Sequence, residues 1–67
     1  MNIQSAIIKG ANILKDKYIQ SAQLDAEILM AKAIGEDRKY IILNNDQNLK
    51  EESLKYFQEL INERSTR

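Results

Sequence analysis

Hydrophobic residues near the start of the chain recur with the spacing of an α-helix. They are separated by three or four positions: Ile3, Ala6, Ile7, Ala11, Ile13 and Leu14. This spacing places them on one face and predicts an amphipathic helix from Ile3 to about Lys15. Gly10 lies inside that helix, where a glycine costs roughly 1 kcal/mol relative to alanine. Either Gly10 marks the place where another helix crosses closely, or the helix simply tolerates a glycine there.

A second helix is predicted from about Ala22 to Ile34. Residues 16–20 break the helical period, and Ser21 is a candidate N-cap whose hydroxyl oxygen would accept an amide of the first turn. Apolar residues then occur on nearly every side, which predicts a helix surrounded by its neighbours. Gly35 stands at the position of a left-handed C-cap. We expect this helix to be central, with Leu29→Ala costing about 2 to 5 kcal/mol.

A short third helix is predicted from Arg38 to about Asn44, with Asp37 as its N-cap. The segment Tyr-Ile-Ile-Leu is also good strand material. A strand would have no partner elsewhere in the chain and would leave its backbone groups unsatisfied, so helix is the preferred assignment. The polar residues 44–48 compete for backbone hydrogen bonds and predict a loop.

The last helix is predicted to begin after Lys50. Leu49 and Leu54 have the spacing of a hydrophobic staple around this start, and acidic residues occupy the first turn. Its buried side chains would be Leu54, Phe57, Leu60 and Ile61. A chain of 67 residues has room for one modest core. The pattern therefore predicts an all-α fold: one domain over residues 1–67, built as a small bundle of four to five helices around the helix from about Ala22 to Ile34.

Composition and charge exclude several classes of function. The chain has no cysteine and no histidine, and its ten basic residues equal its ten acidic residues. Without a basic excess, we expect no direct contact with nucleic acid. The only candidate recognition helix, residues 38–43, is mostly apolar, and we expect Tyr40, Ile41, Ile42 and Leu43 to point inward to the core rather than to base edges. The apolar runs Ile28–Ala31 and Ile41–Leu43 are far shorter than the ~20 residues of a membrane span. We expect a soluble, cytoplasmic domain.

No catalytic constellation is present in the sequence. It contains neither GxGxxG, GxxxxGK[ST] nor GxSxG, and its serines have no candidate base. Tyr18, Tyr40 and Tyr56 could stack on nucleic-acid bases, but isolated tyrosines at helical spacing more often lie at the edge of a core. Asp25 and Glu27 lie near a helix N-terminus, whose partial positive charge favours them there, and no nucleophile or metal accompanies them. The sequence therefore predicts no catalytic, no cofactor-binding and no metal-binding residue.

In combination, the order and spacing of several motifs resemble a known family. They are Ser21, LDAEILMAKAIGEDR over residues 24–38, the apolar YIIL, a polar loop ending at Leu49, and Glu-Arg at 63 and 64. Together they resemble the N-terminal domain of the release-factor glutamine methyltransferases, the PrmC (HemK) family. The similarity covers essentially the whole chain. Two positions depart from the usual family pattern, since Ala22 stands in place of a proline and Lys50 in place of a capping serine or threonine.

The resemblance implies a two-domain enzyme. A helical N-terminal domain would precede a Rossmann-like domain that binds S-adenosylmethionine and methylates the glutamine of the GGQ motif in peptide-chain release factors. The glycine-rich loop and the Asn-Pro-Pro-Tyr motif of that catalytic domain do not occur in this sequence, which has no proline. The chain alone is thus expected to be neither an enzyme nor a binder of the cofactor.

Two functions follow as hypotheses. The first is a substrate-recognition domain, with a release factor and its own C-terminal methyltransferase domain as partners. The alternative is a free-standing helical adaptor between proteins. Arg38 and Lys39, at the start of the third helix, are the candidate partner-binding residues because arginine is enriched at binding hot spots. Equally, Arg38 could form an ion pair with Asp25 or Glu27, with Lys39 simply solvated.

Overall fold

The computed structural model describes residues 1–66, and this part of the chain folds into four helices. They are α1 (Ile3–Asp16), α2 (Ala22–Ile34), α3 (Arg38–Leu43) and α4 (Glu51–Ser65). The all-α prediction is confirmed, and the segment that could have been a strand is helical. The one bridge between extended residues, Asn2 with Asn48, joins the start of the chain to the loop before α4.

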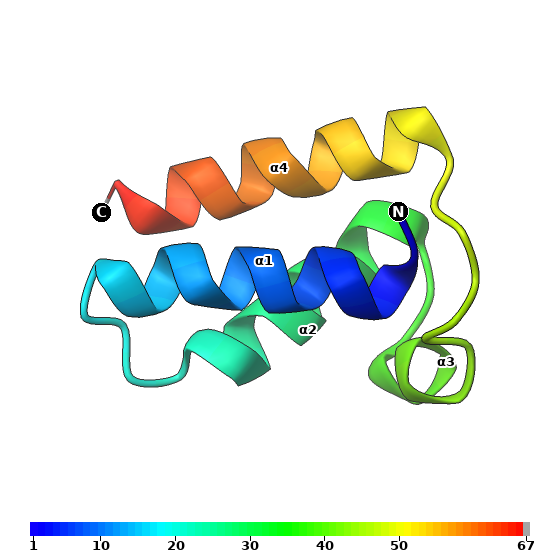
Figure 1. The fold of residues 1–67 in the computed structure, drawn as a ribbon, viewed down its shortest axis with the longest axis horizontal. Coiled ribbons are helices and arrows are strands. Elements are labelled where there is room, and N and C mark those ends of the chain that lie inside the picture. Colours follow the sequence, from blue (N-terminus) through cyan, green and yellow to red (C-terminus); the bar gives the residue numbers. More distant parts are fainter. Residues whose placement is uncertain (67) are drawn as a thin grey trace.

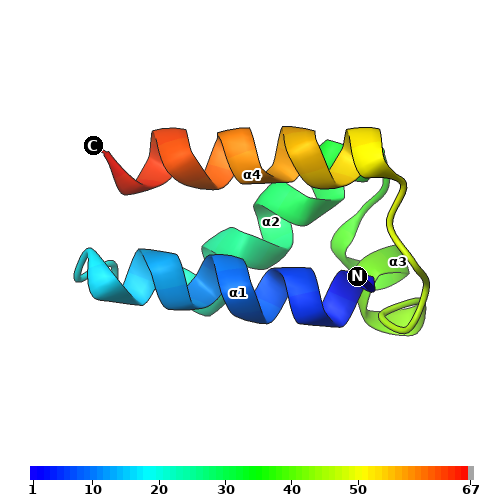
Figure 2. The same ribbon diagram turned by 45° about the horizontal axis from the view of Figure 1, so that its top comes forward.

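The two longest helices, α1 and α4, lie side by side and run in the same direction. Helix α2 crosses behind both of them, and α3 lies at the end of the molecule where α1 begins (Figures 1 and 2). Helix α2 packs against all three other helices of the described chain, so its central position is confirmed. The core between them consists mainly of aliphatic side chains: Ile3, Ala6, Ile7, Ala11, Leu14, Ala22, Ala26, Met30, Ala31, Ile41, Phe57, Leu60 and Ile61.

The prediction that α2 is surrounded on every side is wrong. Leu24 and Ile28 are 43% and 47% exposed, and Leu29 is only partly buried. The reason is geometric, because α1, α4 and the short α3 cover one side of α2 and leave the other to solvent. Met30, rather than Leu29, is the large side chain of this helix that is completely buried.

Gly10 marks a close crossing between α1 and α4. A Cβ atom at this position would lie 2.8 Å from Cζ of Phe57 and 3.0 Å from Cδ1 of Ile61. These distances are shorter than ordinary van der Waals contact, so only a residue without a side chain lets the two helices approach this closely. Of the two explanations that the sequence left open, the close crossing is confirmed.

The first turn of α1 depends on a distant part of the chain. The first four amides of a helix have no partner within the helix itself. Here the amide of Ile3 donates to the carbonyl of Gln47, and the amide of Gln4 donates to the carbonyl of Asn45, both at 2.9 Å. The next two amides donate to the side-chain and backbone oxygens of Asn2. The polar loop thus completes the start of α1.

The other helix starts agree with the predicted boundaries, with one correction. Asp37 caps α3 as predicted, since its carboxylate accepts the amide of Tyr40 at 2.9 Å. Ser21 precedes α2 but makes no capping bond: its hydroxyl donates to the carboxylate of Asp25 at 3.1 Å, and its ψ of 29° is not the extended conformation of a typical N-cap. Helix α4 begins directly after Lys50 without a side-chain cap.

Helices α1 and α2 end in the same backbone arrangement with different residues. At the end of α2, Gly35 has a φ of 74°, and the next amide, of Glu36, donates to the carbonyl of Ala31. At the end of α1, Tyr18 has a φ of 62°, and the amide of Ile19 donates to the carbonyl of the residue five positions earlier. Both are Schellman motifs, which favour glycine at the left-handed position. Gly35 was predicted from the sequence and Tyr18 was not.

Replacing Tyr18 with glycine should stabilise the domain. The left-handed conformation costs a non-glycine residue about 1 to 2 kcal/mol, and glycine's larger entropy loss on folding offsets part of this gain. The Tyr18 side chain is 93% exposed, so little packing is lost. We expect a gain of about 0.5 kcal/mol, raising the midpoint of thermal unfolding by a few degrees. Lys17→Gly, one residue earlier at a φ of −97°, should not stabilise; an equal gain in both variants would contradict the explanation.

Candidate protein-docking surface

The outer side of α3 combines exposed aliphatic and basic side chains. We call Arg38, Lys39, Ile42 and Leu43 the α3 face, because spacings of three and four place them on neighbouring parts of the helix surface. Ile42 and Leu43 are 58% and 70% exposed, whereas Ile41 on the opposite side is buried. Contiguous exposed apolar patches that are rimmed by polar residues mark contact sites for other proteins.

The sequence had suggested that Ile42 and Leu43 point inward, and this prediction is wrong. A helix of six residues can turn only one side toward the core, and Ile41 with the partly buried Tyr40 fills that side. The aliphatic part of the surface was therefore missed. The sequence did contain an indication of this surface. Residues 38 and 42, and likewise 39 and 43, are four positions apart and therefore lie together on the side of the helix opposite residue 41.

Several hydrogen bonds hold α3 in place. Besides the Asp37 cap, the hydroxyl of Tyr40 donates to Oε1 of Gln47 at 3.0 Å, and the side-chain amide of Asn44 donates to the carbonyl of Tyr40 at 3.1 Å. The α3 face is thus presented by a fixed helix rather than by a free loop, which lowers the entropy cost of binding.

Arg38 forms an ion pair with Glu27, one of the two outcomes that the sequence allowed. Its Nη2 atom lies 2.8 Å from Oε1 of Glu27, and its Nε atom donates to the same oxygen at 3.3 Å. Donation from Gln23, and then from Arg38, holds the pKa of the Glu27 carboxyl below its usual value. The pair joins the start of α3 to the middle of α2.

The lowered pKa of Glu27 predicts an acid-sensitive contribution to stability. A carboxyl whose pKa is lower in the folded state stabilises the fold above its unfolded pKa of about 4.3 and loses this contribution as the pH falls through the folded value. Glu27→Gln should therefore lower the urea midpoint at pH 7 more than at pH 3. The exposed Glu59→Gln on α4 is the control, and the same loss for Glu27→Gln at both pH values would contradict the prediction.

The second ion pair of the described residues connects α4 with α2. Nη2 of Arg64 lies 3.1 Å from Oδ2 of Asp25, which also accepts the hydroxyl of Ser21. Asp25 and Glu27 thus each have a basic partner, Arg64 and Arg38 respectively. Within residues 1–66 no three acidic side chains gather as a metal site would require. Nor is any helix of this part long and apolar enough to cross a membrane.

The structure separates the two residues that the sequence proposed for partner binding. Arg38 is held by Glu27 although its side chain is still 48% exposed. Lys39 is exposed and forms no ion pair with any residue from 1 to 66. Lys39 is therefore the more available cation of the α3 face. A role in binding stays a prediction for both residues.

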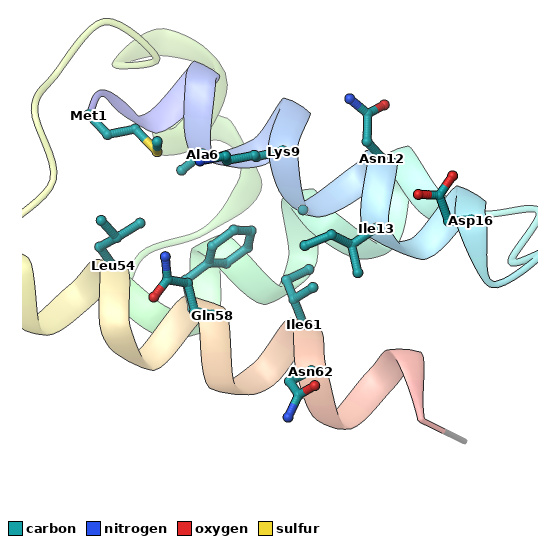
Figure 3. A pocket seen from close by; sticks show the side chains of 12 residues that line it. Met1, Ala6, Lys9, Asn12, Ile13, Asp16, Leu54, Gln58, Ile61 and Asn62 are labelled. Carbon is teal, nitrogen blue, oxygen red and sulfur yellow. The ribbon is translucent and has the colours of Figure 1, made fainter.

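A second surface feature is a groove of about 540 Å³ between α1 and α4. Its floor contains Gly10 and Phe57, and Figure 3 shows Ile13 of α1 and Ile61 of α4 projecting toward one another across it. We call it the α1/α4 groove. The sequence did not predict it, because its walls come from segments more than thirty residues apart.

Fold and surface together define a small helical domain with one partly apolar helix face exposed. The model of the PrmC N-terminal domain family matches residues 5–67, and the chain belongs to this family. The resemblance found in the sequence is thereby confirmed.

Curated relatives carry the name release factor glutamine methyltransferase. The chain is 41% identical over 59 residues to the protein of Clostridium botulinum, covering 87% of this chain and 21% of that protein. It is 33% identical over 64 residues to the protein of Clostridium acetobutylicum, covering 96% of this chain and 22% of that protein. The chain thus spans about a fifth of the length of these relatives. No solved structure gave a significant match.

Proposed function

We propose that this domain recognises the protein substrate of a release factor glutamine methyltransferase, and that the α3 face makes the contact. The observation that carries the proposal is the exposure of Ile42 and Leu43 beside Lys39 on a helix that hydrogen bonds hold in place. Family membership supports a release factor as the partner. A cytoplasmic location is part of the same proposal.

Catalysis belongs, in this proposal, to a methyltransferase domain outside these residues. The α1/α4 groove has an apolar floor and no glycine-rich turn, so it does not fit the charged S-adenosylmethionine. The role of this domain is then to position a large substrate, which raises the local concentration of the GGQ loop at the catalytic site. Calorimetric titration of residues 1–67 with S-adenosylmethionine should show no saturable binding.

The test compares two substrates in the full-length enzyme. Ile42→Ser with Leu43→Ser, or Lys39→Glu alone, should lower kcat/KM for the intact release factor by about tenfold, because hot-spot residues each contribute on the order of 1 to 2 kcal/mol. Methylation of a short GGQ-containing peptide should not change, because the peptide does not reach this domain. The matched control is Ile8→Ser, which removes a half-exposed isoleucine from α1.

Arg38 requires a charge exchange rather than a single reversal. Arg38→Glu alone would place two carboxylates together at Glu27, whereas Arg38→Glu combined with Glu27→Lys keeps an ion pair and moves the positive charge to α2. Slower methylation of the intact release factor by the exchanged enzyme would support a direct contact. If the α3-face variants slowed methylation of both substrates equally, substrate recognition would be contradicted. If the isolated chain bound a release factor and the full-length enzyme did not, the free-standing adaptor would be favoured.

A further inference from the structure

We propose that the α1/α4 groove is a self-association surface, in which two copies of the chain pair with their α1 helices antiparallel. This inference is independent of the α3 face. One stripe of α1 faces the groove at helical spacing: Ala6, Lys9, Gly10, Ile13 and Asp16. Figure 3 places Met1 and Leu54 at one end of the groove and Asp16 and Asn62 at the other.

The charges along this stripe are complementary to themselves. Lys9 and Asp16 carry opposite charges and lie about 10 Å apart along the helix axis. A two-fold axis that crosses α1 between Asn12 and Ile13 would place Lys9 of each copy opposite Asp16 of the second copy. Because the contact is symmetric, a single arrangement forms two such pairs.

The exposed side chains of the groove also favour a second α1 as its occupant. Ile13 is 45% exposed and gives each copy an aliphatic side chain to bury. The α4 wall contributes the uncharged Gln58 and Asn62, which oppose neither sign of charge. A parallel pairing in register would instead bring each Lys9 against its own copy.

The size of the molecule sets the strength of this association. The molecule is small, with extents of 28 × 20 × 17 Å, whereas stable complexes typically bury roughly 800 Å² per partner. The zero net charge removes overall repulsion between copies. We therefore expect a weak dimer, with a dissociation constant between about 10 μM and 1 mM.

Sedimentation velocity of the 67-residue chain at low salt, from about 10 μM to 1 mM, tests the pairing. Lys9→Glu and Asp16→Lys should each raise the dissociation constant at least about tenfold, because either change creates two like-charge contacts. The double variant Lys9→Glu/Asp16→Lys should restore the wild-type value within a factor of about three. Lys55→Glu, an exposed reversal on α4 outside the groove, is the matched control.

A second variant tests the apolar contact. Ile13→Ser should abolish the dimer, while circular dichroism shows that the helices remain. A chain that stays monomeric up to 1 mM would overturn the proposal. The proposal would also be overturned if the Lys9 and Asp16 reversals left the dissociation constant unchanged, or if the double variant failed to restore it. Either result would point to another face, such as the exposed Leu24 and Ile28 of α2.

Discussion

Phe57→Ala should lower the free energy of unfolding by about 3 to 5 kcal/mol, the range found for aromatic residues removed from protein cores. The ring is 2% exposed and faces Gly10 at the crossing of α1 and α4. Gly10 has no side chain with which to fill the space that the ring would leave. A single core in a chain this short rarely supplies more than about 3 to 5 kcal/mol, so the variant should be largely unfolded at 25 °C.

The neighbouring residue provides the control for this prediction. Tyr56 is also aromatic and also on α4, but it is 41% exposed. Tyr56→Ala should therefore cost no more than about 1 kcal/mol, and urea titration followed by circular dichroism at 222 nm compares the two variants. Equal midpoints for Tyr56→Ala and Phe57→Ala would show that α4 does not pack through Phe57.

Met30→Ala should be the most costly truncation within α2, with a loss of about 2 to 5 kcal/mol. Met30 is completely buried where α2 crosses α1 and α4, and its removal leaves a cavity in the part of the core that all the long helices share. Leu29→Ala removes a side chain of similar size from the same turn. It should cost clearly less, because Leu29 is only partly buried.

The comparison of Met30→Ala with Leu29→Ala measures which side of α2 faces the core. Both substitutions replace a long side chain with the best helix former, so changes in helix propensity nearly cancel between them. The difference in urea midpoint at an unchanged denaturant slope reports packing alone. A greater loss for Leu29→Ala would mean that α2 is rotated about its axis relative to the structure described above.

Local pattern determined most of the fold. The pattern of apolar residues located the three long helices, and the lack of a partner strand assigned α3 as a helix. Asp37 and Gly35 marked the start of α3 and the end of α2, because an aspartate caps a helix start and a glycine adopts the left-handed conformation at a helix end. Which side of α2 is buried depends on how many helices surround it, and composition does not contain that information. The left-handed conformation of Tyr18 could not be predicted either, because tyrosine does not favour that conformation.

The candidate surface was predictable only in part. The position of Arg38 one turn beyond the end of α2 made its ion pair with an acid of α2 a stated alternative, and the structure forms it with Glu27. The exposure of Ile42 and Leu43 followed from the shortness of α3, since a single turn and a half has too little surface to bury four apolar residues. The α1/α4 groove required knowledge that α1 and α4 lie side by side.

The hydrogen bonds between the start of α1 and the loop before α4 have a consequence for the order of folding. Starting a helix is its least favourable step, because several residues must be fixed for the first bond. In this chain two of the amides at that start find their acceptors at Asn45 and Gln47. During synthesis the ribosome must therefore release more than forty further residues before the beginning of α1 can be completed. Protection of the Ile3 and Gln4 amides from hydrogen exchange would then report the moment at which the whole domain closes.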